Sequence, residues 1–194
     1  MSSYAIDDGA RLLLFDQLAV PDEILELAAD HEPLVVLTAP WHERDTQSLV
    51  ERLGLSVFVP PPDTADDLVR KYGITPEQAA GGSPDVAWLL AGDGGEAHLY
   101  AAGDRLPLAI EALPGREHND LVLWIESVGA VIPGDTLVDF GRGLEINEWL
   151  RGGVTASRSS NDCGRCWRFR SRSCSRRTEH RQTVLRSSAR SPDR

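Results

Sequence analysis

The chain has 194 residues, a formal net charge of −10 and a hydrophobic content of 41%. This length and composition provide enough apolar side chains for a globular core, which excludes a wholly disordered protein. No apolar run approaches the roughly 20 residues that span a bilayer, and the first residues lack the basic and apolar regions of a secretory signal. We therefore expect a cytoplasmic protein without a membrane partner.

The charge is divided unevenly along the chain. Residues 1–150 contain 8 Lys and Arg against 27 Asp and Glu, whereas residues 151–194 contain 12 Arg against three acidic residues. The first part should repel nucleic acid, and the second part taken alone would attract it. All three cysteines lie in the second part, so the first has no disulfide and no thiol nucleophile. The chain divides into an α/β domain over residues 1–150 and an Arg/Ser-rich tail over residues 151–194.

Residues 11–60 combine buried-strand and helical patterns in alternation. Apolar runs at 11–16, 33–39 and 55–60 predict strands that are covered on both faces. Residues 20–31 and 45–54 between them predict helices, the second with Asp45 as its candidate cap and Gly54 as its stop. The resulting βαβαβ order predicts a parallel sheet with right-handed crossovers.

The middle of the chain has a different pattern. Two short helical pieces are predicted at 63–73 and 75–82. Strand-length segments then follow between residues 97 and 140, separated by Gly, Pro and Asn turn signals, which is typical of an antiparallel meander. Parallel α/β sequence followed by strand-rich sequence predicts a layered α/β fold.

Three loops at predicted strand ends concentrate polar residues. They contain His42 and Asp45 after the second strand, His118 before the strand at 120–127, and Asp135 after the segment "AVI". His and Asp side chains bind zinc and act as acids or bases. Each residue also has an ordinary structural interpretation, as a helix-entry cap for His42 and Asp45 and as a turn residue for His118 and Asp135. The residues alone leave both interpretations open.

The order of these segments, "VVLTAPWHERD", "LPGREHND" and "IPGDTLVDF", resembles the metallo-β-lactamase-fold hydrolases over roughly residues 4–150. In that family a strand ends in Leu-Thr-His-x-His-x-Asp-His, a Gly-His loop and a Gly-Asp pair follow, and a final His lies near the C-terminus. The resemblance implies a layered αββα fold, a zinc centre, and hydrolysis of an ester, thioester or lactone-type bond. Gly134 and Asp135 match the Gly-Asp pair, whose Asp bridges two metals in the family.

The chain departs from the family at most metal-ligand positions. The residues found at the positions of the first two His, the Asp, the third His and the loop His are Ala39, Trp41, Glu43, Arg44 and Arg116. The family's opening hairpin is also expected to be missing, as is its last His, so the fold is predicted to be incomplete at both ends.

A reduced metal site can still be assembled from the remaining donors. A catalytic zinc needs about three protein ligands. We expect His42, Asp45, His118 and Asp135 to supply one zinc ion at most or none, with Asp135 and Asp45 as the catalytic carboxylates.

Three functions are therefore weighed. The first is a hydrolase-like protein with a degraded metal site, acting on a small-molecule substrate. The second is a non-catalytic member of the fold that binds a small molecule or a partner. The third is nucleic-acid binding through the tail, against which the strongly acidic first 150 residues argue.

The tail has an explanation in the genetic code. Its cysteines and His180 fit no zinc-finger spacing. When residues 156–193 are back-translated with G/C-rich codons, an adjacent frame permits a helical segment, then "VEVVLPTHG", then a second helix and a stop. Pro-Thr-His-Gly looks like the family's terminal metal-binding motif. We predict that residues from about 156 are an out-of-frame translation without stable packing, which the nucleotide sequence of codons 150–194 would test.

Overall fold

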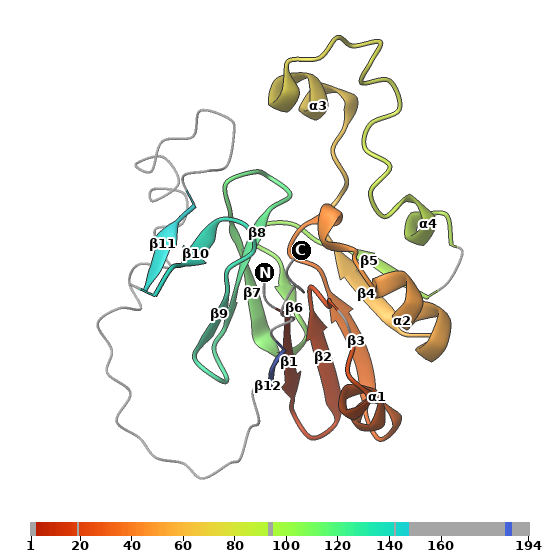
Figure 1. Ribbon diagram of the computed structural model, residues 1–194, viewed down its shortest axis with the longest axis vertical. Helices are drawn as coiled ribbons and strands as arrows, with labels where there is room; N and C mark the ends of the chain where they lie inside the picture. Colours follow the sequence, from red (N-terminus) through yellow and green to blue (C-terminus); the bar gives the residue numbers. More distant parts are fainter. Residues whose placement is uncertain (1–2, 19, 93–94, 142, 148–184, 188–194) are drawn as a thin grey trace, which may run out of the picture.

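Two β-sheets stack against each other in the computed structural model, which describes residues 3–18, 20–92, 95–141, 143–147 and 185–187 (Figure 1). The first sheet has six strands in the order β12-β1-β2-β3-β4-β5, and the second has four in the order β6-β7-β8-β9. A separate hairpin, β10-β11, follows the second sheet. Within these residues no helix is long and apolar enough to cross a bilayer.

The elements follow one another closely along the chain. The strands of the first sheet are β1 (Ser3–Asp7), β2 (Arg11–Phe15), β3 (Glu32–Val36), β4 (Ser56–Val59), β5 (Ala97–Leu99) and β12 (Leu185–Ser187). The other strands are β6 (Arg105–Leu106), β7 (Ile110–Pro114), β8 (Leu121–Ile125), β9 (Ala130–Ile132), β10 (Leu137–Asp139) and β11 (Leu144–Ile146). The α-helices are α1 (Asp22–Ala29), α2 (Thr46–Leu53), α3 (Ala65–Tyr72) and α4 (Ala87–Leu90).

The predicted βαβαβ unit is confirmed. Strands β2, β3 and β4 pair in parallel, and α1 and α2 provide the connections between them. Helix α2 ends where Gly54 adopts a left-handed conformation with φ of 62°, which glycine adopts without the steric cost of a Cβ. The sequence was sufficient to predict this unit because the apolar residues of each segment follow one clear pattern, either that of a buried strand or that of a helix.

Three segments differ from the sequence-based expectation. Residues 97–99 were assigned to the meander, but β5 pairs in parallel with β4 and joins the first sheet. Residues 75–82 form turns instead of a helix. The chain also opens with a strand that the sequence did not predict, β1, which forms an antiparallel hairpin with β2. Only residues 105–132 form the antiparallel meander.

Strand β2 shows how one apolar run fills two layers. Leu12 and Leu14 pack with the side chains of α1 and α2, whereas Leu13 and Phe15 pack with those of β7 and β8. Successive side chains of a strand point to opposite faces, so a continuous apolar run is what a sheet covered on both faces requires. Figure 1 shows α1 and α2 on one face of the first sheet and the second sheet on its other face.

The outer face of the second sheet has a smaller core. Leu113 and Val122 are buried there with Leu137, and Trp124 and Ile146 pack against them. Among the described residues, the β10-β11 hairpin covers this face of the second sheet.

Most of the predicted tail, and with it the proposed nucleic-acid site, lies outside the described residues. The three described residues form β12, which pairs antiparallel with β1. The expectation that the tail has no stable packing stays a prediction.

Candidate functional site

The polar residues at the carboxyl ends of the strands meet at one edge of the two sheets. Asp16 follows β2, Thr38 and His42 follow β3, and Asp135 follows β9. His42 closes a short 3-10 turn, Pro40–His42, which brings its ring back toward β2. Ligand sites of α/β folds are built at such strand ends.

His42 lies between two carboxylates and is only 5% exposed. Its Nδ1 is 3.3 Å from Asp16 Oδ2, and its Nε2 is 3.2 Å from Asp135 Oδ1. The Thr38 hydroxyl donates to Asp16 Oδ2 at 2.6 Å and lies 3.0 Å from His42 Nδ1. Both ring nitrogens therefore face acceptors, which favours the doubly protonated imidazolium.

The pKa values follow from this geometry. Burial by itself lowers the pKa of His42, but the hydrogen bonds to Asp135 and Asp16 and their negative charges outweigh it and raise the pKa to about 9. The hydrogen bond from His42 lowers the pKa of Asp135 to about 2, against the opposing effect of burial. The raised pKa of His42 and the lowered pKa of Asp135 favour an imidazolium–carboxylate pair at neutral pH.

Alkaline pH is therefore expected to destabilise the protein. The pKa of His42 is about 9 when folded and 6.5 in its reference state, so its contribution is complete below pH 6.5 and is lost as pH rises through 9. The expected loss is about 3 kcal/mol of unfolding free energy, because the two pKa values differ by about 2.5 and each unit is worth about 1.36 kcal/mol. Urea denaturation at pH 6, 8 and 10, with EDTA present, measures it. The His42→Gln variant should show a flatter profile, and identical profiles would contradict the assignment.

Asp135 has protein partners on both of its oxygens. Besides His42 on Oδ1, the Trp41 indole donates from Nε1 to Oδ2 at 3.0 Å. Beneath it, Asp120 is fully buried and accepts from the Asp135 backbone N–H and the Thr136 hydroxyl. Burial raises the pKa of Asp120 to about 6, although these hydrogen bonds oppose the shift.

The resemblance places Glu43, Arg44 and Ala39 at metal-ligand positions, and the structure shows other roles for these residues. The Glu43 carboxylate accepts from the Val86 N–H at 3.0 Å and from Trp88 Nε1 at 2.8 Å, which holds the first turn of α4 in place. Arg44 donates to the backbone carbonyl of Asp16 at 2.8 Å. The side chain of Ala39 is buried and offers no donor atom. These positions therefore stabilise loops in this chain.

A cavity of about 770 Å³ opens beside Asp135. Its polar wall includes Asp16, His42, Arg44 and Asn147, and its apolar wall comes largely from the β10-β11 hairpin and β9. Two of the apolar side chains are well exposed, Phe140 at 62% and Leu144 at 44%. The cavity combines a charged, hydrogen-bonding end with an apolar side.

The structure brings together only part of the predicted metal-ligand set. His42 and Asp135 are in contact, whereas His118 pairs with Asp67, at 3.5 Å from Nε2 to Oδ2. Asp45 occupies the N-cap position of α2, but its side chain makes no capping hydrogen bond. A zinc ion shared by His42, Asp45, His118 and Asp135 stays a prediction.

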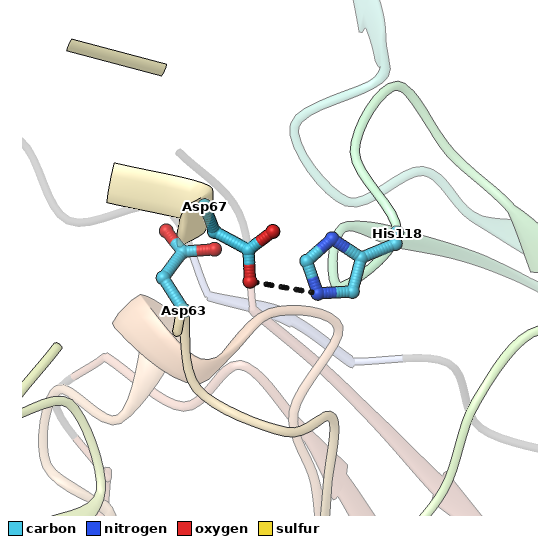
Figure 2. A group of neighbouring side chains, drawn as sticks. All are labelled: Asp63, Asp67 and His118. Atoms are coloured by element: carbon cyan, nitrogen blue, oxygen red, sulfur yellow. Dashed lines mark ion pairs between the residues drawn. The ribbon is translucent and has the colours of Figure 1, made fainter. Parts of the chain in front are cut away.

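A second group of metal-type donors lies between the start of α3 and the β7–β8 loop (Figure 2). Asp63, Asp67 and His118 each offer a ligand atom, and these atoms lie within 4.8 Å of one another. Asp63 and Asp67 are buried and His118 is exposed.

Several residues of the site were not identified from the sequence. Asp16 directly follows a strand, so the strand-end argument applied to the other loops would have found it. Lys71 is the only lysine in the chain, and this rarity is a signal that the composition offers. Its side chain is only 10% exposed in the structure. Asp63 and Trp41 carried no such signal, because their roles depend on contacts distant in sequence.

Comparisons with known proteins connect this architecture to a known fold. No protein-family model matches the sequence, and no curated protein matches it. The crystal structure of TTHA1623 in a di-iron-bound form matches with a TM-score of 0.51 and 20% identity, over 84% of this chain and 79% of that one. The BLEG-1 B3 metallo-beta-lactamase matches with a TM-score of 0.48 and 15% identity, over 78% and 74%. The chain therefore has the metallo-β-lactamase fold.

Proposed function

We propose that this protein binds a small molecule in the cavity beside Asp135 and does not operate the dinuclear hydrolytic centre typical of its fold. The observation that carries the proposal is that both carboxylate oxygens of Asp135 already have protein donors, His42 Nε2 and Trp41 Nε1. A bridging carboxylate would need these oxygens for metal ions.

The donor set at the fold's metal positions does not fit such a centre. A tryptophan indole nitrogen is a donor only and has no lone pair to give a metal. The guanidinium groups of Arg44 and Arg116 are always charged and cannot serve as ligands. Glu43 has a side chain of a metal-binding type, but its carboxylate holds the first turn of α4. No catalytic step is therefore assigned to a metal here.

The cavity favours an amphipathic ligand. An apolar part of the ligand would pack on Leu137, Phe140 and Leu144, and a polar head would reach the imidazolium–carboxylate end at His42 and Asp135. Burial of an apolar group as large as a leucine or phenylalanine side chain is worth about 1.5 to 3 kcal/mol. This is enough for weak specific binding once the polar head of the ligand is also paired.

A fragment screen by ligand-observed NMR tests the proposal. We expect amphipathic fragments to bind the wild type and to lose at least about tenfold in affinity in Leu144→Ser, because that side chain supplies exposed apolar wall. Leu99→Ser is the matched control, since Leu99 is 58% exposed and does not line the cavity. Fragments that bind equally to both variants would contradict the proposal.

A metal-dependent hydrolase is the second candidate. The observation that favours it is the group of Asp63, Asp67 and His118, whose ligand atoms lie within 4.8 Å. One stoichiometric metal ion, lost in His118→Ala together with hydrolysis of an ester, thioester or lactone, would establish this function in place of ligand binding alone.

The out-of-frame origin of the tail is part of this proposal. The alternate frame would add a helix, a strand and a Pro-Thr-His-Gly motif to a domain whose second sheet has a small outer core. If the gene encodes that ending, the protein to assay for metal and hydrolysis is the one that carries it. If no frame does, the basic tail belongs to this protein.

A further inference from the structure

Lys71 is held as a bound cation inside the structure. Its Nζ is 2.7 Å from Asp63 Oδ1 and 2.9 Å from Asp63 Oδ2, and it donates to Asn119 Oδ1 at 3.3 Å. The side chain is 10% exposed and Asp63 is 4% exposed, so this ion pair is largely shielded from water. Such a pair is strongly coupled, because removing one partner leaves a buried charge.

Two further groups complete what we call the Lys71 cage, formed by Asp63, Glu117, Asn119 and Trp41. Lys71 Nζ lies 4.8 Å from the centroid of the Trp41 ring and 3.9 Å from Glu117 Oε2. An aromatic face, carboxylates and an amide oxygen are all ligands for a cation. Trp41 also donates to Asp135, so the cage is connected to the site beside the cavity.

The Lys71 cage shares Asp63 with the metal-type group of Asp63, Asp67 and His118. In Figure 2 the Asp63 and Asp67 carboxylates lie next to each other, with the His118 ring turned toward Asp67. A divalent ion in this group would need an oxygen of Asp63, and both of its oxygens accept from Lys71.

The charges of the region are already compensated by the chain itself. Asp67 pairs with Arg70 at 2.6 Å, Glu117 with Arg116 at 3.6 Å, and Asp63 with Lys71. A divalent ion would therefore face three nearby cations while competing for carboxylates that are engaged. The Coulomb cost of placing an ion beside a buried ammonium is large at a low effective dielectric constant.

We propose that the Lys71 ammonium is the resident cation of this group and keeps divalent ions out, and that the group becomes a divalent-cation site when the ammonium is removed. Lys71 thereby joins α3 to the β7–β8 loop without a metal. This inference does not rest on ligand binding in the cavity, and it is tested by a different measurement.

Two variants of the full chain distinguish the effect of removing the ammonium charge from the effect of making room for an ion. Lys71→Ala removes the ammonium and leaves room for an ion, whereas Lys71→Met removes the charge and fills the same volume with an apolar chain. Mn²⁺ is the probe, since carboxylate-rich sites bind it and the cysteine-containing tail prefers softer ions. Free Mn²⁺ is followed by electron paramagnetic resonance, and stability by urea denaturation.

We expect Lys71→Ala to bind Mn²⁺ at least about tenfold more tightly than the wild type or Lys71→Met. The gain should disappear in the Lys71→Ala/His118→Ala double variant. If Lys71→Ala is largely unfolded, millimolar Mn²⁺ should raise its urea midpoint, because an ion that binds only the folded state stabilises it. Equal Mn²⁺ affinity in all variants, tight binding by the wild type, or no Mn²⁺ effect on Lys71→Ala would overturn the proposal.

Discussion

Replacing Asp16 by alanine is expected to lower the free energy of unfolding by about 3 to 5 kcal/mol. The buried Asp16 carboxylate accepts from the Thr38 N–H at 2.8 Å and the Thr38 hydroxyl at 2.6 Å, and it faces His42 Nδ1 at 3.3 Å. Alanine would leave the buried amide without its acceptor and the imidazolium with one carboxylate in place of two. Alanine also disfavours the left-handed backbone of this residue, whose φ is 47°.

Asp16→Asn is the matched control. Asparagine keeps an acceptor oxygen for Thr38 and tolerates the left-handed backbone, so it removes mainly the negative charge. We expect it to cost less than half as much as alanine in urea denaturation at pH 7. Equal destabilisation by the two variants would contradict this division of roles, because it would assign the whole effect to the negative charge and none to the hydrogen-bond acceptor.

Gly115→Ala is expected to destabilise the protein by about 3 kcal/mol or more, because the added Cβ has no space. A Cβ built on Gly115 would lie 1.9 Å from the Asp120 carbonyl oxygen and 2.5 Å from the Thr136 hydroxyl oxygen. The first of these is a backbone atom, so the β7–β8 loop would have to move. Thermal unfolding followed by circular dichroism measures the effect.

Gly129→Ala provides the comparison for Gly115→Ala. Gly129 has a φ of 64° and no atom within 4 Å of a built Cβ, so alanine there meets only backbone strain. The expected cost is about 1 kcal/mol. A cost at residue 115 no larger than that at residue 129 would mean that the loop repacks freely, and that the close approach does not fix the site.

The candidate site was only partly predictable from the sequence. The strand-end argument identified His42 and Asp135, which are in contact 93 positions apart in the chain. It did not identify Asp16 as the second partner of His42, nor Lys71 as the cation of its cage. Those roles depend on which loops meet in space, and polarity alone does not encode that.

The parallel βαβαβ unit could be predicted from the sequence, since its buried strands and amphipathic helices have strong local periods. The resemblance also places residues such as Ala39 and Trp41 at metal-ligand positions of the metallo-β-lactamase fold, an assignment that depends on residue identity alone. Only the folded chain shows that β5 joins the first sheet and that β1 forms a hairpin with β2. It also shows which carboxylates pair with His42 and Lys71, because the folded chain brings these partners together from distant parts of the sequence.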